Sequence, residues 1–93
     1  MKQILTLSMV AMTKHSELEN LKKREKIQRY FWNEVGAVEH ISLPRLKNAV
    51  KKEFKCNDDR FIQVQIKLMQ TEARIRIESR VKVWIKPPQT DSL

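Results

Sequence analysis

The chain has 93 residues and a formal net charge of +8, which comes from 19 lysine and arginine residues against 11 aspartate and glutamate residues. This length suits one domain with a modest core, and the hydrophobic fraction of 41% excludes a wholly disordered chain. So much positive charge on a small domain favours a polyanionic partner, with nucleic acid first and an anionic membrane surface second.

The cysteine content and the N-terminal sequence bear on the compartment and on the domain limits. Cys56 is the only cysteine, so no disulfide can form within the chain, and we expect a reducing, cytoplasmic environment. The apolar run at residues 4–12 is too short to span a membrane and lacks a clear signal-peptide cleavage site. We expect residues 1–13 to form an N-terminal extension, either a strand or an arm, before a domain of residues 14–88 and a disordered tail of residues 89–93.

A first helix is expected at residues 16–35. Ser16 and Glu19, three positions later, form a capping box that would begin the helix, and Gly36 is placed to end it. The first half is mostly charged, so we expect it to be solvated. Apolar residues recur at helical spacing in the second half and predict a buried side. These residues are Ile27, Tyr30, Phe31 and Val35.

A short strand at residues 39–41 and a second helix at residues 42–54 are expected next. Ser42 is the predicted N-cap, and Pro44 falls in the first turn, where its missing N–H removes no hydrogen bond. The predicted apolar stripe of this helix consists of Leu43, Leu46, Val50 and Phe54. The basic residues of the segment are Arg45, Lys47, Lys51, Lys52 and Lys55.

Residues 60–70, RFIQVQIKLMQ, fit either a strand or a helix. As a strand, the alternation over residues 62–68 is clean, but Phe61 and Met69 would lie on the polar face. The turn that would follow, QTEA, also lacks the residues that turns prefer.

As a helix, the same segment has a good beginning and one fault. Asn57 or Asp58 supplies an N-cap, and Asp58 and Asp59 place negative charge in the first turn, where the helix dipole favours it. The fault is Gln65, which falls in the middle of an apolar arc. The arc consists of Phe61, Ile62, Val64, Ile66, Leu68 and Met69. The helix is favoured because the opposite stripe contains no apolar residue. That stripe consists of Arg60, Gln63, Lys67 and Gln70.

Residues 73–86 alternate between apolar and polar side chains and predict a β-hairpin. With residues 78–80 as its loop, apolar residues would pair across the two strands. The predicted pairs are Ile77 with Val81, Ile75 with Val83, and Ala73 with Ile85. The other face of the hairpin would then show Arg74, Arg76, Lys82, Trp84 and Lys86.

The order helix, short strand, helix, tight turn, helix and hairpin resembles the winged helix-turn-helix superfamily. The resemblance covers residues 16–86 and rests on ISLPRL after the short strand, the NDD turn, IKLM at the end of the third helix, and RIRIESRVKVWI as the wing. The chain departs from the pattern because TEA stands where many members have a glycine between the third helix and the wing. The resemblance implies an α+β winged helix-turn-helix fold, three helices with a C-terminal two-stranded β-hairpin wing.

The same resemblance implies double-stranded DNA as the partner, with the third helix lying in the major groove as the recognition helix. Arginine and lysine can donate to guanine there, and glutamine can pair with adenine. The candidate base-reading residues are Arg60, Gln63, Lys67 and Gln70. Phosphate contacts need only positive charge and reach. The candidates for these contacts are Arg45, Lys47, Lys51 and Lys52 on the second helix and Arg74, Arg76, Arg80 and Lys82 on the wing.

Small proteins similar to this one are typically homodimers that regulate transcription by occupying palindromic operators. Two other interpretations stay open at this point. The domain could bind other proteins within a larger assembly, or it could be a nonspecific architectural or RNA-binding protein. The basic faces could also be ordinary solvated surface.

Little in the sequence supports catalysis. His15 and His40 are far apart in the chain, and no cluster of cysteine and histidine has metal-ligand spacing. The single glycine, Gly36, excludes a phosphate-binding P-loop and a dinucleotide fingerprint. We therefore expect a protein that is not an enzyme and that needs no cofactor, metal or small-molecule ligand.

Overall fold

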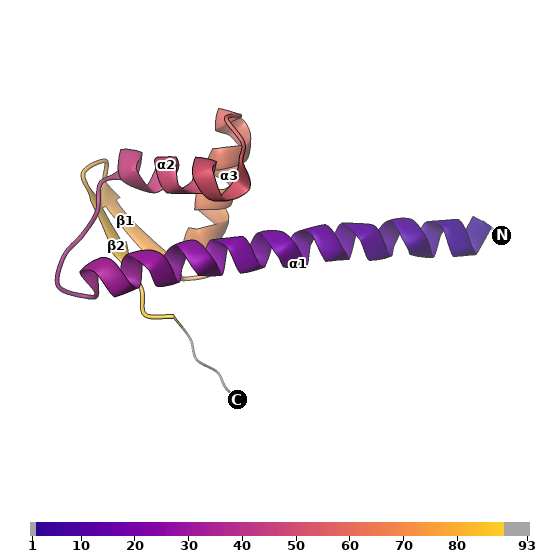
Figure 1. Cartoon of the computed structure of the whole chain (residues 1–93), viewed down its shortest axis with the longest axis horizontal. Helices are drawn as coiled ribbons and strands as arrows, with labels where there is room; N and C mark the ends of the chain where they lie inside the picture. The colour runs from indigo at the N-terminus through magenta and orange to yellow at the C-terminus, as the bar shows by residue number, and fades with distance from the viewer. Residues whose placement is uncertain (1, 89–93) are drawn as a thin grey trace.

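The chain folds into three helices followed by a two-stranded antiparallel hairpin, as Figure 1 shows. The computed structural model describes residues 2–88, with side chains from residue 17 onward, and the expected tail at residues 89–93 lies outside the described residues. The elements are α1 (Lys2–Val35), α2 (Leu43–Phe54), α3 (Asp59–Thr71), β1 (Ile75–Ser79) and β2 (Lys82–Ile85). The expected α+β class is therefore confirmed, and the segment RFIQVQIKLMQ is helical.

α1 is longer than the capping box predicted. It begins at Lys2, so Ser16 lies inside the helix, and the segment expected as a strand or an arm is helical and continuous with it. No proline or glycine interrupts the chain before Gly36, so nothing stops the helix at Ser16. Figure 1 shows the first half of α1 extending away from the other elements, whereas its second half packs against them.

The other end of α1 matches the prediction. Gly36 has a φ of +59°, and its N–H donates to the carbonyl oxygen of Trp32 at 2.9 Å. Glycine suits this left-handed position because a Cβ atom is disfavoured there.

α2 and α3 begin at their predicted caps. The Ser42 hydroxyl oxygen accepts from the backbone N–H of Arg45 at 3.3 Å. The Asp58 carboxylate accepts from the backbone N–H of Arg60 at 3.0 Å. These short polar side chains satisfy N–H groups that the first turn of a helix leaves without partners.

One hydrophobic core joins all the elements. The short strand expected at residues 39–41 is reduced to one bridge, in which Ile41 and Val83 exchange two backbone hydrogen bonds of 2.9 and 2.8 Å. Because Val83 pairs with β1 on its other side, Ile41 lies along the edge of β2 that is opposite β1. The buried apolar side chains are Ile27, Phe31, Ile41, Leu46, Val50, Ile62, Ile66, Met69, Ile75, Val83 and Ile85.

The register of the hairpin differs from the prediction. The observed pairs are Ile75 with Ile85, Arg76 with Trp84, Ile77 with Val83, and Ser79 with Lys82. The predicted pairs, Ile77 with Val81, Ile75 with Val83, and Ala73 with Ile85, are therefore wrong. The error has a local cause, because a β-bulge between Ile77 and Ser79 takes up one residue and only Arg80 and Val81 remain to form the turn.

Two backbone features mark the two ends of the hairpin. At the turn, the N–H of Leu43 donates to the carbonyl oxygen of Arg80 at 2.8 Å, which ties the hairpin to the start of α2. At the other end, Ala73 is not part of β1 but has a φ of +59°. Ala73 thus occupies a left-handed position at the place where the resemblance leads one to expect a glycine.

Candidate nucleic-acid interface

The outer side of α3 carries all four side chains that the sequence singled out as base readers. Arg60, Gln63, Lys67 and Gln70 are exposed. The inner side packs into the core through Ile62, Gln65, Ile66 and Met69. Within residues 17–88, neither Arg60 nor Lys67 forms an ion pair. Both cations are therefore available to an external anion or acceptor.

Val64 lies on the exposed side of α3, although the sequence placed it in the apolar arc. Its exposed fraction is 52%. Helical spacing puts it one turn from Arg60 and from Lys67, so an apolar side chain borders the polar stripe. The sequence could have indicated this exposure, because Val64 lies at the edge of the apolar arc of α3.

The hairpin presents three exposed cations, Arg76, Arg80 and Lys82. Arg80 lies in the turn, at the tip of the hairpin. The guanidinium of Arg76 lies 5.9 Å from the centre of the Trp84 ring and 3.9 Å from a carboxylate oxygen of Glu78. Arg80 and Lys82 form no ion pair within residues 17–88, so this end of the hairpin has an excess of positive charge.

Two arginines from the expected phosphate-binding set, the half-buried Arg74 and the exposed Arg45, have partners within the chain. Arg74 donates from Nε to Glu72 at 2.7 Å and from a terminal nitrogen to the amide oxygen of Gln28 at 2.8 Å. Arg45 forms an ion pair with Glu34 of α1 and lies over the Phe31 ring, 5.4 Å from its centre. Both guanidinium groups already have partners in the chain, which makes them poorer phosphate ligands than free cations.

The three lysines of α2 have no such partners. Lys52 is exposed, whereas Lys47 and Lys51 are half-buried, and none of them forms an ion pair within residues 17–88. Half-burial of a lysine stem leaves its ammonium group free to reach solvent. The available cations of α2 are therefore these lysines and not Arg45.

A buried polar cluster, made of Arg24, Gln28, Gln65, Glu72 and Arg74, connects α1 to α3 and to the hairpin. Arg24, only 6% exposed, donates to Gln65 at 2.7 Å and to both oxygens of Glu72 at 3.1 and 2.7 Å. Gln28 donates to the carbonyl oxygen of Lys86 at 2.8 Å. The cluster holds the C-terminal end of α3 against α1 and so contributes to the orientation of the exposed stripe.

Sequence reasoning missed this cluster. Gln65 looked like a fault in the apolar arc, and the charged half of α1 was expected to be solvated. The signal that could have found it was Gln65 itself, because a glutamine in the middle of a buried arc needs a hydrogen-bond partner.

The polar cluster predicts a specific pH dependence of stability. Burial by itself raises the pKa of Glu72, but the hydrogen bonds and charges of Arg24 and Arg74 outweigh it and hold the pKa below its ordinary value. A lowered folded-state pKa contributes stability above the unfolded pKa, and this stability is lost as the pH falls through the folded pKa. We expect the free energy of unfolding to decline below about pH 4.5, and the Glu72→Gln variant to show a flatter profile. Urea denaturation from neutral to acidic pH measures this, and equal slopes for both proteins would contradict it.

A scan against protein-family models, a search of curated proteins and a search of solved structures each gave no match to this chain. Within residues 2–88, no helix has a stretch both long and apolar enough to cross a membrane. What the chain does is therefore inferred from its own geometry and charge.

Proposed function

We propose that this protein is a winged-helix DNA-binding protein that places α3 in the major groove of a duplex. The observation that carries the proposal is the outer side of α3, where Arg60, Gln63, Lys67 and Gln70 are exposed together while the inner side is buried. A helix anchored on one side and polar on the other can enter the groove as a rigid reader of base edges.

The order and pairing of the elements support the winged-helix assignment. Three helices precede a hairpin, and the bridge between Ile41 and Val83 adds a third short strand position beside β2. The hairpin turn is tied to α2 through Leu43 and Arg80, so the wing and the helices form one body.

Cations on α2 and on the hairpin, which precede and follow α3 in the chain, would contact phosphates and set the register on the duplex. The proposed phosphate-contacting residues are Lys47, Lys51 and Lys52 of α2 and Arg76, Arg80 and Lys82 of the hairpin. Arg45 and Arg74 are left out because their guanidinium groups have partners within the chain. The protein would act by operator occupancy as a transcriptional regulator in the cytoplasm.

A homodimer fits this proposal. The first half of α1 extends away from the rest of the chain (Figure 1), and its sequence at residues 4–12 contains no charged residue. At its base, Leu18 is 48% exposed. A second copy pairing along this part of α1 would bring two recognition helices to two half-sites of a palindrome.

Site selection from random duplexes tests the proposal, with wild type compared to the triple variant Arg60→Ala/Gln63→Ala/Lys67→Ala. We expect wild type to select a defined site, and the triple variant to lose roughly tenfold or more of its preference for that site over random duplex. Fluorescence anisotropy measures both affinities. A triple variant with unchanged preference would remove α3 from the interface. Failure of wild type to bind any duplex at low salt would instead favour a protein-interaction module.

A further inference from the structure

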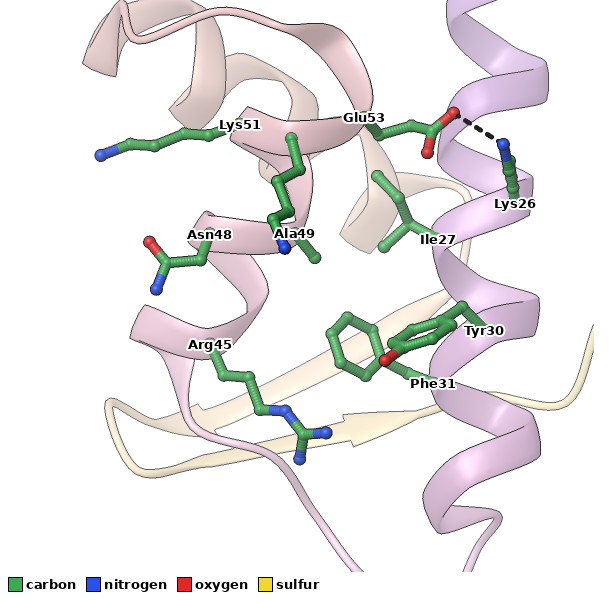
Figure 2. A pocket seen from close by; sticks show the side chains of 10 residues that line it. Lys26, Ile27, Tyr30, Phe31, Arg45, Asn48, Ala49, Lys51 and Glu53 are labelled. Atoms are coloured by element: carbon green, nitrogen blue, oxygen red, sulfur yellow. Dashed lines mark ion pairs between the residues drawn. The ribbon is translucent and has the colours of Figure 1, made fainter.

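A groove of about 650 Å³ runs between α1 and α2, and Figure 2 shows it from close by. Its apolar lining comes from Ile27 and Phe31 of α1 and Ala49 of α2. Tyr30 adds a ring that is 58% exposed and packs edge-on against Phe31 at a centroid distance of 5.1 Å. No residue of α3 lines the groove, so it is separate from the proposed base-reading stripe.

The rim of this groove carries an excess of positive charge. The charged residues that line it are Lys26, Arg45, Lys51, Lys52 and Glu53, which give a formal charge of +3 from four cations and one carboxylate. Glu53 is paired with Lys26 at 3.4 Å, as the dashed line in Figure 2 shows. Arg45 is paired with Glu34. Lys51 and Lys52 are left without an ion pair within residues 17–88.

We infer that this groove docks an acidic amphipathic helix of a protein partner. The exposed ring of Tyr30 and the half-buried Ala49 call for apolar side chains, and the cationic rim calls for carboxylates beside them. From Arg45 to Glu53 the groove follows α2 over nine residues, or about 12 Å, which matches roughly two turns of a partner helix. Apolar residues spaced three and four apart on the partner would lie on Tyr30 and Ala49.

Duplex DNA fits this groove less well than such a helix. A duplex would satisfy the cations of the rim but has no apolar side chains to cover the tyrosine ring and the lining beneath it. None of the base-reading residues lines the groove, although Lys51 and Lys52 of its rim also belong to the proposed phosphate-contacting set.

Titration of the ¹⁵N-labelled full chain with synthetic peptides tests the inference. One peptide is a helix with leucine and phenylalanine at positions i, i+3, i+4 and i+7 and acidic residues elsewhere, and its control has alanine at the apolar positions. We expect the first peptide to shift the amide signals of Tyr30, Asn48 and Ala49, and the alanine peptide to shift them little. Equal shifts from the two peptides, or shifts confined to α3, would overturn the inference.

Two variants and a matched control sharpen this test. Ala49→Glu places a carboxylate in the groove and should weaken the acidic amphipathic peptide about tenfold, and Lys52→Glu on the exposed rim should weaken it several-fold. Lys22→Glu makes the same charge change on α1 at an exposed position that does not line the groove, so it should bind as wild type does. If Lys22→Glu weakens binding as much as Lys52→Glu, attraction is nonspecific and the groove has no role. In a parallel titration, duplex DNA is expected to shift the signals of Lys51 and Lys52 but not those of Tyr30. Duplex DNA that shifts the Tyr30 and Ala49 signals as strongly as the acidic peptide does would assign the groove to DNA and would also overturn the inference.

Discussion

Raising the salt concentration from about 50 mM to about 200 mM is expected to weaken binding to duplex DNA roughly a thousandfold. Each phosphate that the protein neutralises releases a condensed counterion, and this release becomes less favourable as salt is added. Six cations form the proposed phosphate-contacting set: Lys47, Lys51, Lys52, Arg76, Arg80 and Lys82. Of these six, only Arg76 forms an ion pair within residues 17–88, with Glu78 at 3.9 Å. Six contacts from one protomer on its half-site give a slope of about −5 for log affinity against log salt, counted for each protomer that binds.

Single substitutions show how much each cation contributes to this slope. Arg80→Ala and Lys82→Ala should each reduce its magnitude by about 0.9 and weaken selected and random duplexes by a similar factor, because phosphate contacts carry no sequence information. Lys22→Ala removes an equally exposed cation from α1, outside the proposed contact set, and should leave the slope unchanged. Fluorescence anisotropy over a salt series gives the slopes. A nearly flat plot of log affinity against log salt for wild type would end the DNA-binding proposal. Equal slope changes for Lys22→Ala and Arg80→Ala would show that the hairpin makes no specific phosphate contacts.

The sequence predicted the parts of the fold that depend on neighbouring residues. Ser42 and Asp58 cap α2 and α3 as expected, and Gly36 ends α1, because each makes hydrogen bonds within one turn of its own position. The outer stripe of α3 was found for the same reason, since helical spacing separates it from the buried side. Local chemistry was enough to place the candidate base readers.

Most of the errors concern contacts between segments that are distant in the chain, although the bulge in the hairpin is local. The hairpin register depends on a bulge and on the hydrogen bond from Leu43 to Arg80, neither of which the alternation of residues 73–86 reveals. Arg45 looked like a free cation because Glu34, its partner on α1, lies 11 positions away. Arg74 has one partner 46 positions away, Gln28, and one only two positions away, Glu72, which the sequence reasoning overlooked. Gln65 looked out of place until Arg24, 41 positions away, provided its partner. Periodicity shows which side of an element is buried, but not which polar groups meet there.

Glu72, in the polar cluster, is the residue whose loss should destabilise the fold most among its ion-paired carboxylates. It accepts from Arg24 at 3.1 and 2.7 Å and from Nε of Arg74 at 2.7 Å, so one carboxylate serves two guanidinium groups. The Arg24 side chain is 8% exposed and reaches no other carboxylate within residues 17–88. A buried guanidinium that loses its anionic partner still bears its desolvation free energy, and no ion pair offsets it.

Replacing Glu72 by alanine should therefore lower the free energy of unfolding by about 2 to 3 kcal/mol, which is less than for a fully buried pair because the glutamate side chain is 24% exposed. Glu53→Ala is the matched control, since it removes a carboxylate of similar exposure whose partner, Lys26, is 73% exposed, and it should cost less than about 1 kcal/mol. Urea denaturation followed by circular dichroism at neutral pH measures both. A small domain has little stability to spare, so the Glu72 variant should also lose DNA binding at temperatures where Glu53→Ala still binds. Equal and small losses for both variants would mean that Arg24 finds water or another acceptor when Glu72 is gone, and that the apolar core alone orients α3.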